Sequence, residues 1–145
     1  MPTDVPTRTE TELASALRLS VMRLARRLRA QRDNNLSLNQ VAALATVERH
    51  GPMTPGELAD HEKVQPPSMT RILASLEAAG LLARTPHPTD GRQALLALSP
   101  SGAVLLREDR RRRDAWLARR MKELQPGELE VLAKAAAVLD RLAGG

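Results

Sequence analysis

The sequence contains no cysteine, and this absence excludes disulfides, thiolate metal sites and a cysteine redox sensor. It also contains no phenylalanine, no tyrosine and a single tryptophan, Trp116. Proteins that bind single-stranded nucleic acid stack bases on aromatic side chains, and this chain lacks such a platform. No apolar run approaches the ~18–20 residues that are needed to cross a bilayer, so we expect no membrane-spanning segment.

Charged residues, in contrast, are abundant: 22 Lys and Arg against 17 Asp and Glu give a formal net charge of +5. A basic domain favours polyanions, of which nucleic acid is the first and an anionic membrane surface the second. Because aromatic platforms are missing, the charge indicates duplex DNA. The 145 residues suffice for one domain with its own core. The start of the chain, MPTDVPTRTETE, does not resemble a signal peptide, so we expect a cytoplasmic protein.

Apolar residues recur at helical spacing near both ends of the chain. Residues 1–9 are polar and are predicted to be disordered. A stripe then predicts an amphipathic helix that runs to about Arg32, and a second begins at Ser99-Pro100 and runs to about Leu124. A final helix restarts at Gln125, with an apolar stripe of Leu129, Leu132, Ala136 and Leu139. A lone long helix cannot bury its stripe, so residues 10–36 and 99–145 are predicted to be dimerisation helices.

Three short helices are predicted between these ends. Ser37 and Thr54 each precede a glutamine or glutamate by three residues, which is the pattern of a helix N-terminal capping box. The third helix opens with Pro66 and Pro67, whose missing N–H groups cost nothing in a first turn, and it ends near Gly80. Its core-facing positions are Met69, Ile72, Leu73 and Leu76.

The stretch from Gly80 to Leu98 predicts two short apolar strands joined by a tip that contains Asp90, Gly91 and Arg92. Such a ribbon needs a turn residue that tolerates positive φ, and Asp-Gly supplies one. A helix with a polar start followed by a basic hairpin outlines a winged helix-turn-helix. We therefore predict a mainly α fold with a small β-hairpin wing, whose DNA-binding core spans residues 37–98 between long terminal helices.

The run GPMTPGELADHEKVQPPSMTRILASLEAAGLLARTPHPTDGRQALLALSPSG resembles the core of the MarR (multiple-antibiotic-resistance regulator) family. That family shows a glycine-proline start, a T-P-x-E-L-A helix, a P-P-S-x-T-R recognition helix, G-L-x-x-R and a D-x-R wing tip in the same order. Two departures stand out. Gln65 replaces the usual serine cap of the recognition helix, and the wing reads D-G-R rather than the frequent D-R-R.

The resemblance implies a homodimeric transcriptional regulator, a repressor in our interpretation, that binds a pseudo-palindromic operator with half-sites ~34–36 Å apart. It implies recognition helices in successive major grooves and wings in the flanking minor grooves. It also implies release when a small, often phenolic, molecule binds. No motif marks the effector pocket, and the sequence does not separate a repressor from an activator.

The candidate site residues lie on the recognition helix, the wing and two caps. Arg92 at the wing tip is expected in a narrow minor groove, and Asp90 is expected to fix the tip by pairing with Arg92 or Arg84. Arg71 could chelate a guanine, hold a phosphate or pair within the fold. The full set of DNA-binding candidates is Ser37, Thr54, Gln65, Pro66, Pro67, Ser68, Thr70, Arg71, Ser75, Arg84, Asp90, Gly91 and Arg92.

Other conspicuous residues receive plainer interpretations. Arg110 to Arg113 span a full helical turn and cannot form one face, so we expect a solvated helix surface with ion pairs to Glu108, Asp109 and Asp114 rather than a DNA contact. Trp116 either packs or lines an effector pocket. The three histidines, His50, His61 and His87, form no ligand cluster in the sequence, so we expect no metal and no cofactor.

Three rival functions remain open. The basic charge permits a non-specific architectural DNA-binding protein, which an affinity ratio for specific over scrambled DNA would distinguish. An enzyme with a winged-helix appendage is disfavoured, because no catalytic motif is present and the chain has no spare length. A winged helix that binds only protein would be indicated if Arg71→Ala and Arg92→Ala left DNA binding unchanged.

Overall fold

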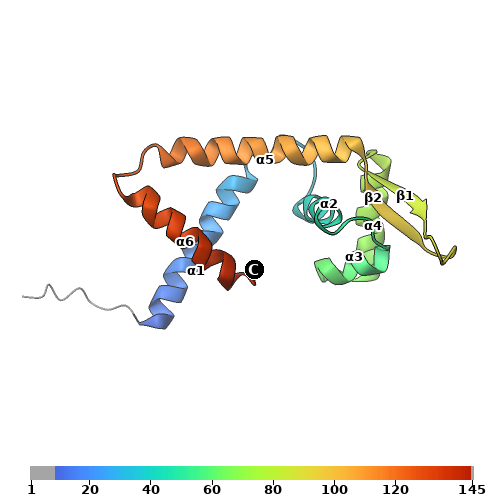
Figure 1. Ribbon diagram of the computed structural model, residues 1–145, viewed down its shortest axis with the longest axis horizontal. Helices are drawn as coiled ribbons and strands as arrows, with labels where there is room; N and C mark the ends of the chain where they lie inside the picture. Colours follow the sequence, from blue (N-terminus) through green and yellow to red (C-terminus); the bar gives the residue numbers. More distant parts are fainter. Residues whose placement is uncertain (1–8, 145) are drawn as a thin grey trace, which may run out of the picture. The chain divides into compact units, whose positions relative to one another are not determined.

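The computed structural model describes residues 9–144, which form six helices and one two-stranded antiparallel sheet (Figure 1). The predicted fold class, mainly α with a small β-hairpin, is confirmed. Of the segment predicted to be disordered, residues 1–8 lie outside the described residues, and Thr9 caps the first helix. In chain order the elements are α1 (Glu10–Arg29), α2 (Leu38–His50), α3 (Pro55–Glu62), α4 (Pro66–Ala78), β1 (Leu82–Pro86), β2 (Ala94–Leu98), α5 (Pro100–Met121) and α6 (Glu128–Leu142).

The chain divides into two compact units. One holds the chain up to Arg32 and from Arg112 onward, which places α1, the end of α5 and α6 together. The other holds Asp33–Arg111, which comprises α2, α3, α4, the hairpin and the start of α5. Within residues 9–144, no helix combines the length and the apolar content that crossing a membrane would require.

Side-chain caps begin the short helices where the sequence predicts them. Ser37 Oγ accepts from the Gln40 N–H at 3.2 Å, and Gln40 Oε1 accepts from the Ser37 N–H at 2.7 Å, so the reciprocal capping box is complete. Thr54 Oγ1 accepts from the Glu57 N–H at 3.2 Å. Each bond satisfies a first-turn donor that has no partner within its helix.

Ser99 links the end of the hairpin to the start of α5. Its hydroxyl accepts from the Gly102 N–H at 3.0 Å and donates to the Gly80 carbonyl at 2.6 Å. The Ser99 N–H also donates to the Leu81 carbonyl at 3.1 Å. The predicted serine cap is therefore confirmed, and it joins three segments at one point.

The two long helices end about one turn earlier than predicted. The prediction placed the ends near Arg32 and Leu124, whereas α1 ends at Arg29 and α5 at Met121. In both places the following N–H groups bond three residues back instead of four, for example Leu124 to Met121 at 3.2 Å. The chain thus tightens into a short 3₁₀-type turn before it leaves the helix.

The core of Asp33–Arg111 draws on every element of that unit. On α4, Met69, Leu73 and Leu76 are buried as predicted, while Ile72 packs against the core but stays half-buried. Full burial of each large apolar side chain stabilises the fold by roughly 1.5–3 kcal/mol. The remaining buried apolar residues are Val41, Ala43, Leu44, Val47, Met53, Leu58, Ala59, Leu81, Leu82, Leu96 and Leu106.

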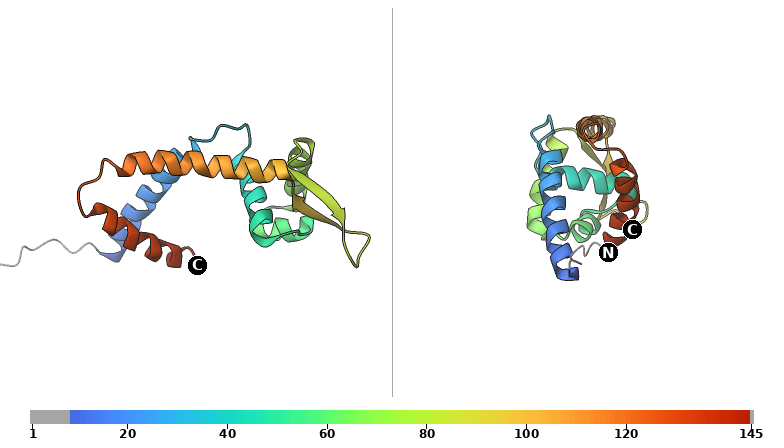
Figure 2. Two further views of the ribbon diagram at one scale, coloured as in Figure 1. Left: turned by 45° about the horizontal axis from the view of Figure 1, so that its top comes forward. Right: turned by 90° about the vertical axis from the view of Figure 1, so that its left-hand side faces the viewer.

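The hairpin is anchored to the helices at its base. β1 and β2 pair from Leu82 opposite Leu98 to Pro86 opposite Ala94. Met53, just before α3, adds a bridge to Leu96, with backbone bonds of 3.2 and 2.7 Å. The fully buried Leu96 side chain completes this attachment. The tip of the hairpin extends away from these anchored residues (Figure 2).

The predicted turn conformation at the tip is wrong. Asp-Gly was expected to place Gly91 at positive φ, but Gly91 is not among the glycines with positive φ. The strands end at Pro86 and Ala94, so the connection is longer than a tight Asp-Gly turn. Because a longer loop can reverse the chain through successive turns, it does not need a left-handed glycine at its centre.

The other unit leaves its apolar residues exposed. No residue of α1 or α6 is buried. Leu13, Leu24 and Leu129 are 55%, 44% and 52% exposed. These residues belong to the predicted stripes, which the single chain leaves in contact with water.

Trp116 lies in this unit between two guanidinium groups. Arg27 and Arg120 stand 5.5 and 5.4 Å from the centre of the indole ring. Cations at this distance from an indole face are attracted by its electron density. Trp116 therefore packs between two charged side chains of its unit.

Candidate nucleic-acid interface

The first turns of α4 present an exposed polar face. Pro66, Pro67 and Arg71 are exposed, and Ser68 is half-buried. Thr70 is exposed, and its hydroxyl donates to the Pro66 carbonyl at 3.0 Å. Hydrophobic residues hold the opposite face of α4 in the core, so this polar face is fixed toward solvent.

Arg71 pairs with no carboxylate of residues 9–144. The alternative in which it forms a salt bridge within the fold is therefore not observed. Ser75 lies one turn further along the same helix and is also exposed. An exposed and unpaired guanidinium is available to a phosphate or to the edge of a guanine.

The start of α4 lacks a side-chain cap. Gln65 occupies the N-cap position in extended conformation and makes no capping bond. Pro66 and Pro67 supply no N–H, so fewer first-turn donors need a partner. The preceding turn contains Lys63 in the left-handed region, with φ of 53°. Because the two prolines remove first-turn donors, the helix dipole is the main feature that favours an anion at this end of α4.

Arg84 ties the hairpin to α4. Its Nε lies 2.5 Å from Glu77 Oε1, and both side chains are partly exposed. The prediction that Asp90 might pair with Arg84 is therefore wrong, because Arg84 is engaged with α4 instead. The bond fixes the direction of β1 relative to the recognition helix.

Asp90 fixes the wing tip through the backbone. Its Oδ1 accepts from the Arg92 N–H at 3.1 Å, so it bonds to Arg92 through the main chain and not through the guanidinium. The Arg92 side chain is left exposed.

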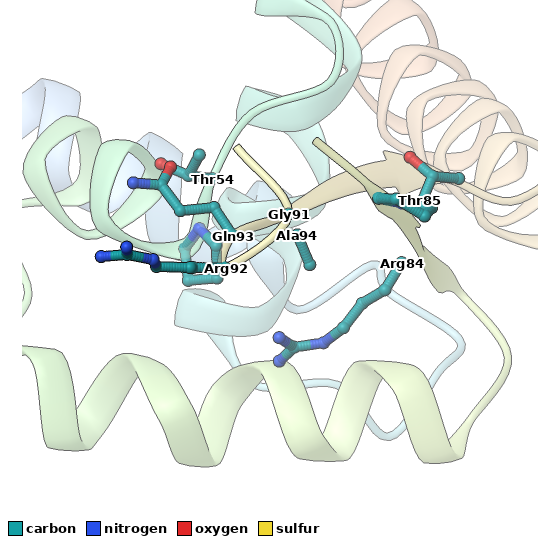
Figure 3. A pocket seen from close by; sticks show the side chains of 9 residues that line it. Thr54, Arg84, Thr85, Gly91, Arg92, Gln93 and Ala94 are labelled. Atoms are coloured by element: carbon teal, nitrogen blue, oxygen red, sulfur yellow. The ribbon is translucent and has the colours of Figure 1, made fainter. Parts of the chain in front are cut away.

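An open recess of about 620 Å³ lies between the hairpin and the start of α3 (Figure 3). Arg84 and Arg92 border it from the hairpin, and Thr54 and Pro55 border it from α3. Thr54 is buried and its oxygen accepts the capping bond, which agrees with its interpretation as a cap first. Two arginines on one recess favour an anionic occupant.

The remaining candidates are not all brought together. Gly91 lines the recess beside Arg92. Ser37 lies at the start of α2, and none of its hydrogen bonds reaches α4 or the hairpin. The α4 and wing candidates thus lie on exposed parts of the unit Asp33–Arg111, and Ser37 of the same unit acts as a helix cap.

Known proteins resemble this chain over most of its length. The sequence profile of the MarR family matches residues 36–94. An uncharacterised HTH-type transcriptional regulator of Mycobacterium bovis is 49% identical, over 88% of this chain and 90% of the relative. A transcriptional repressor of Bacillus subtilis, MdtR, is 28% identical over 91% of this chain and 88% of its own. The crystal structure of a transcriptional regulator from Pseudomonas aeruginosa covers 97% of this chain and 99% of its own, with 34% identity and a TM-score of 0.85.

The chain belongs to the MarR family. It is a DNA-binding transcriptional regulator of the MarR type, and members of this family are not enzymes. The resemblance drawn from the sequence is thereby confirmed.

Sequence reasoning missed some residues of this MarR-family site. Thr85 and Gln93 are exposed and line the recess beside the two arginines. The two-residue period of the strand does not indicate Thr85, because it places this residue on the face opposite Arg84. No pattern marks Gln93, because its position depends on the length of the tip loop.

One arginine of the cluster in this MarR-family chain, Arg110, pairs with a residue outside α5. Arg110 lies 2.5 Å from Glu48 Oε1 of α2, rather than pairing with an acidic neighbour on α5. Asp109, expected on a solvated surface, is fully buried. Arg110 therefore contacts α2, and helical spacing cannot reveal such a contact between distant parts of the sequence.

One of the three histidines, His87, lies in the wing tip, where its ring accepts from the Asp90 N–H. His50 and His61 stack with ring centroids 4.5 Å apart. Residues 9–144 contain no group of three or more His, Cys, Asp or Glu side chains arranged to hold a metal ion. No metal-dependent step is therefore assigned to this regulator.

Proposed function

We propose that this MarR-type regulator is a homodimer that represses transcription by binding a pseudo-palindromic operator, and that a small molecule releases it. The observation that supports DNA recognition best is the pair of exposed arginines, Arg71 on α4 and Arg92 on the wing. The relative MdtR is named a repressor, which supports the same role here. We further propose that the protein acts in the cytoplasm.

The exposed apolar stripes support the dimer. In one unit, α1, the end of α5 and α6 form an open apolar groove of about 440 Å³, lined by Leu24, Leu117, Met121, Leu132 and Leu139 among others. Soluble monomers rarely leave large contiguous apolar patches in water. A second copy related by two-fold symmetry would cover the same stripe on both chains.

In the proposed complex, α4 lies in the major groove. Arg71 contacts a guanine edge or a phosphate, and Ser68, Thr70 and Ser75 lie on the accompanying polar face. Pro66 and Pro67 shape the first turn and contact thymine methyl groups. Gln65 sits at the N-terminal end, where the helix favours a phosphate.

The wing is proposed to enter the adjacent minor groove. The narrow groove concentrates negative potential and attracts the Arg92 guanidinium. Asp90 and Gly91 shape the tip, and Arg84 secures it to α4. With one such module on each chain, the half-sites lie about one helical turn apart, ~34–36 Å.

The effector is proposed from the family resemblance alone. A small molecule, with phenolic acids as the first class to screen, would alter the spacing of the two DNA-binding modules. A shift of a few ångströms would break the register with successive grooves. No effector pocket is assigned.

The test is a gel-shift titration at ~150 mM salt, because electrostatic affinity depends on salt. The probe is the duplex just upstream of the protein's own reading frame, and the competitor is the same duplex scrambled. We expect a specific-to-scrambled affinity ratio in the range ~10³–10⁷. Equal affinity for both duplexes would favour an architectural DNA-binding protein instead.

Arginine variants assign the contacts. Arg71→Ala and Arg92→Ala are each expected to weaken operator binding by about 1–3 kcal/mol. Arg107→Ala is the matched control, because it removes the same charge from an exposed position of α5 outside both elements. If the control weakens binding as much as Arg71→Ala and Arg92→Ala do, the assignment to α4 and the wing is wrong.

A further inference from the structure

The wing tip consists of two consecutive turns that share Asp90. The His87 N–H donates to the Gln93 carbonyl at 3.2 Å and closes the loop at its base. The Gln93 N–H donates to the Asp90 carbonyl at 3.1 Å, which forms the second turn. The first turn spans His87 to Asp90. Arg92 therefore depends on both turns for its position.

Each turn begins with a side chain that accepts backbone N–H groups. In the second turn Asp90 Oδ1 accepts from the N–H two residues on, that of Arg92. In the first turn His87 Nδ1 accepts from the Thr89 N–H at 3.2 Å and from the Asp90 N–H at 3.1 Å. Asp and Asn are the residues that ordinarily bond to the backbone in this way. His87 thus takes the place of an Asp or Asn.

Pro88 favours the hydrogen bonds between the His87 ring and the backbone. It has no N–H, so the Thr89 and Asp90 N–H groups are the donors that the turn must satisfy. It also fixes its own φ and biases His87 toward extended backbone. The ring of His87 is then left beside the two N–H groups that follow the proline.

The bonds require one form of the ring. A nitrogen that accepts from N–H groups has no proton, so the ring is neutral and its proton lies on Nε2. Protonation of Nδ1 would convert the acceptor into a donor that faces the two N–H donors, with only the Thr89 hydroxyl, 3.4 Å away, able to accept from it. The first turn would then lose both bonds.

We propose that neutral His87 is a positioning residue for DNA binding, which holds the first turn of the wing and through Asp90 sets Arg92 for the minor groove. This inference rests on the proposed function of the wing. His87 itself contacts no DNA in this scheme. Acidification therefore weakens specific binding by loosening the wing tip.

Other titratable groups also change the affinity for DNA with pH, and they strengthen binding on acidification instead of weakening it. In the described part of the chain the ring bonds only to Thr89 and to the Asp90 backbone. Added positive charge at low pH strengthens non-specific binding to a polyanion. The charged and titratable side chains on the hairpin and on the helices packed against it are Arg84, Asp90, Arg92, Glu48, Arg49, His50, Glu57, Asp60, His61, Glu62, Lys63, Arg71 and Glu77.

Three variants distinguish the loss of the hydrogen-bond acceptor at position 87 from a change in the charge of the ring. His87→Asn keeps a short acceptor at the same position and cannot titrate. His87→Ala removes the acceptor, and His61→Asn removes a titrating ring elsewhere. We expect His87→Asn to bind the operator like the wild type at about pH 8 and to keep its affinity at about pH 5, the limits between which histidine ordinarily changes charge.

The remaining expectations complete the test. Wild type and His61→Asn are expected to lose about tenfold in specific affinity on acidification, because the net contribution of a hydrogen bond between neutral groups is of this order. At both pH values, His87→Ala is expected to bind the operator about tenfold more weakly than the wild type binds it at pH 8. The inference is overturned if His87→Ala binds like the wild type at pH 8, or if His87→Asn retains the wild-type pH dependence.

A measurement without DNA keeps the two proposals apart. In the free full-length protein, ¹⁵N NMR of the His87 ring is expected to show the Nε2–H tautomer with unprotonated Nδ1 at about pH 8. The Thr89 and Asp90 amide signals are expected to move together with the ring on acidification in the wild type and to stay in place in His87→Asn. Independent titration of ring and amides would overturn the inference even if specific operator binding were established. Absence of specific binding by the wild type at pH 8, with the NMR signature present, would contradict the proposed function alone.

Discussion

Gly102 shows how one missing side chain positions a whole helix. A Cβ at this position would lie 2.4 Å from the Leu81 carbonyl oxygen and 2.8 Å from Leu98 Cδ1. Real Cβ atoms do not approach backbone so closely. The glycine therefore permits α5 to start directly against the residues that flank the hairpin. Its role is close packing, because its φ is not positive.

Gly102→Ala is expected to destabilise the protein by about 1–3 kcal/mol, because the backbone at Leu81 must shift. The measurement is the free energy of unfolding from urea titration. Gly56→Ala is the matched control, since the nearest atom to its added Cβ is 4.0 Å away. The control is expected to be neutral or slightly stabilising. Equal stability of Gly102→Ala and the wild type would contradict the close approach.

The sequence allows good prediction of residues whose role is local. Ser37, Thr54 and Ser99 cap helices as expected, because a cap depends on residues within one turn. Asp109 and Arg110 were predicted to lie on a solvated surface. The prediction was wrong for Asp109 and incomplete for Arg110, because contacts between residues far apart in the sequence decide both. Asp109 is buried and Arg110 pairs with Glu48, which is far away in the sequence.

At the scale of elements, the hairpin is held by backbone and apolar contacts more than by charge. The bridge between Met53 and Leu96 is buried, whereas the Arg84–Glu77 pair is partly exposed, at 44% and 29%. Ion pairs at exposed sites contribute only ~0.2–1 kcal/mol. The pair is therefore suited to orienting the wing and adds little to stability.

A double-mutant cycle with Arg84→Gln and Glu77→Gln measures how much the ion pair contributes to stability. We expect a coupling free energy of ~0.2–1 kcal/mol in urea unfolding, and a smaller value at high salt because solvent ions screen the pair. Arg110 and Glu48 form a similarly exposed pair and provide a comparison cycle. A coupling energy well above this range would mean that the pair is a main anchor of the hairpin.

The period of the sequence pattern predicts the packed faces of the helices but not the conformation of the wing loop. The inner faces of α2 and α4 follow from helical spacing, because each is packed on one side. The wing loop does not follow from its Asp-Gly pair, since the turn is made by an imidazole that bonds to the backbone across Pro88. Propensities describe Asp and Asn in this role and contain no signal for histidine.

For the whole molecule, the decisive property is the apolar stripe that the single chain leaves uncovered. Its members on α1 and α6 were predicted from spacing, and their exposure in one chain is observed. The sequence indicates that the apolar stripe must be covered by other protein surface, but it does not indicate the geometry of that contact. That information lies in the shape of the groove among α1, α5 and α6, which forms only in the folded chain.

Leu132→Asp tests the dimer. Leu132 is 44% exposed on α6 and lines the groove, so the substitution is tolerated by a single chain but places a carboxylate in the proposed interface. Burial of an unpaired charge is costly, and the protein is therefore expected to become a monomer in sedimentation. Leu38→Asp is the matched control, because Leu38 is 50% exposed at the start of α2 and outside the stripe.

The two variants also predict different DNA binding. A monomer engages one half-site, so Leu132→Asp is expected to lose most operator affinity while retaining weak binding through one α4 and one wing. Leu38→Asp is expected to stay dimeric and to bind like the wild type. If Leu132→Asp remains a dimer with unchanged melting temperature, α6 does not lie in the interface. If it becomes a monomer yet binds the operator at full strength, the two modules act independently and the palindromic arrangement is wrong.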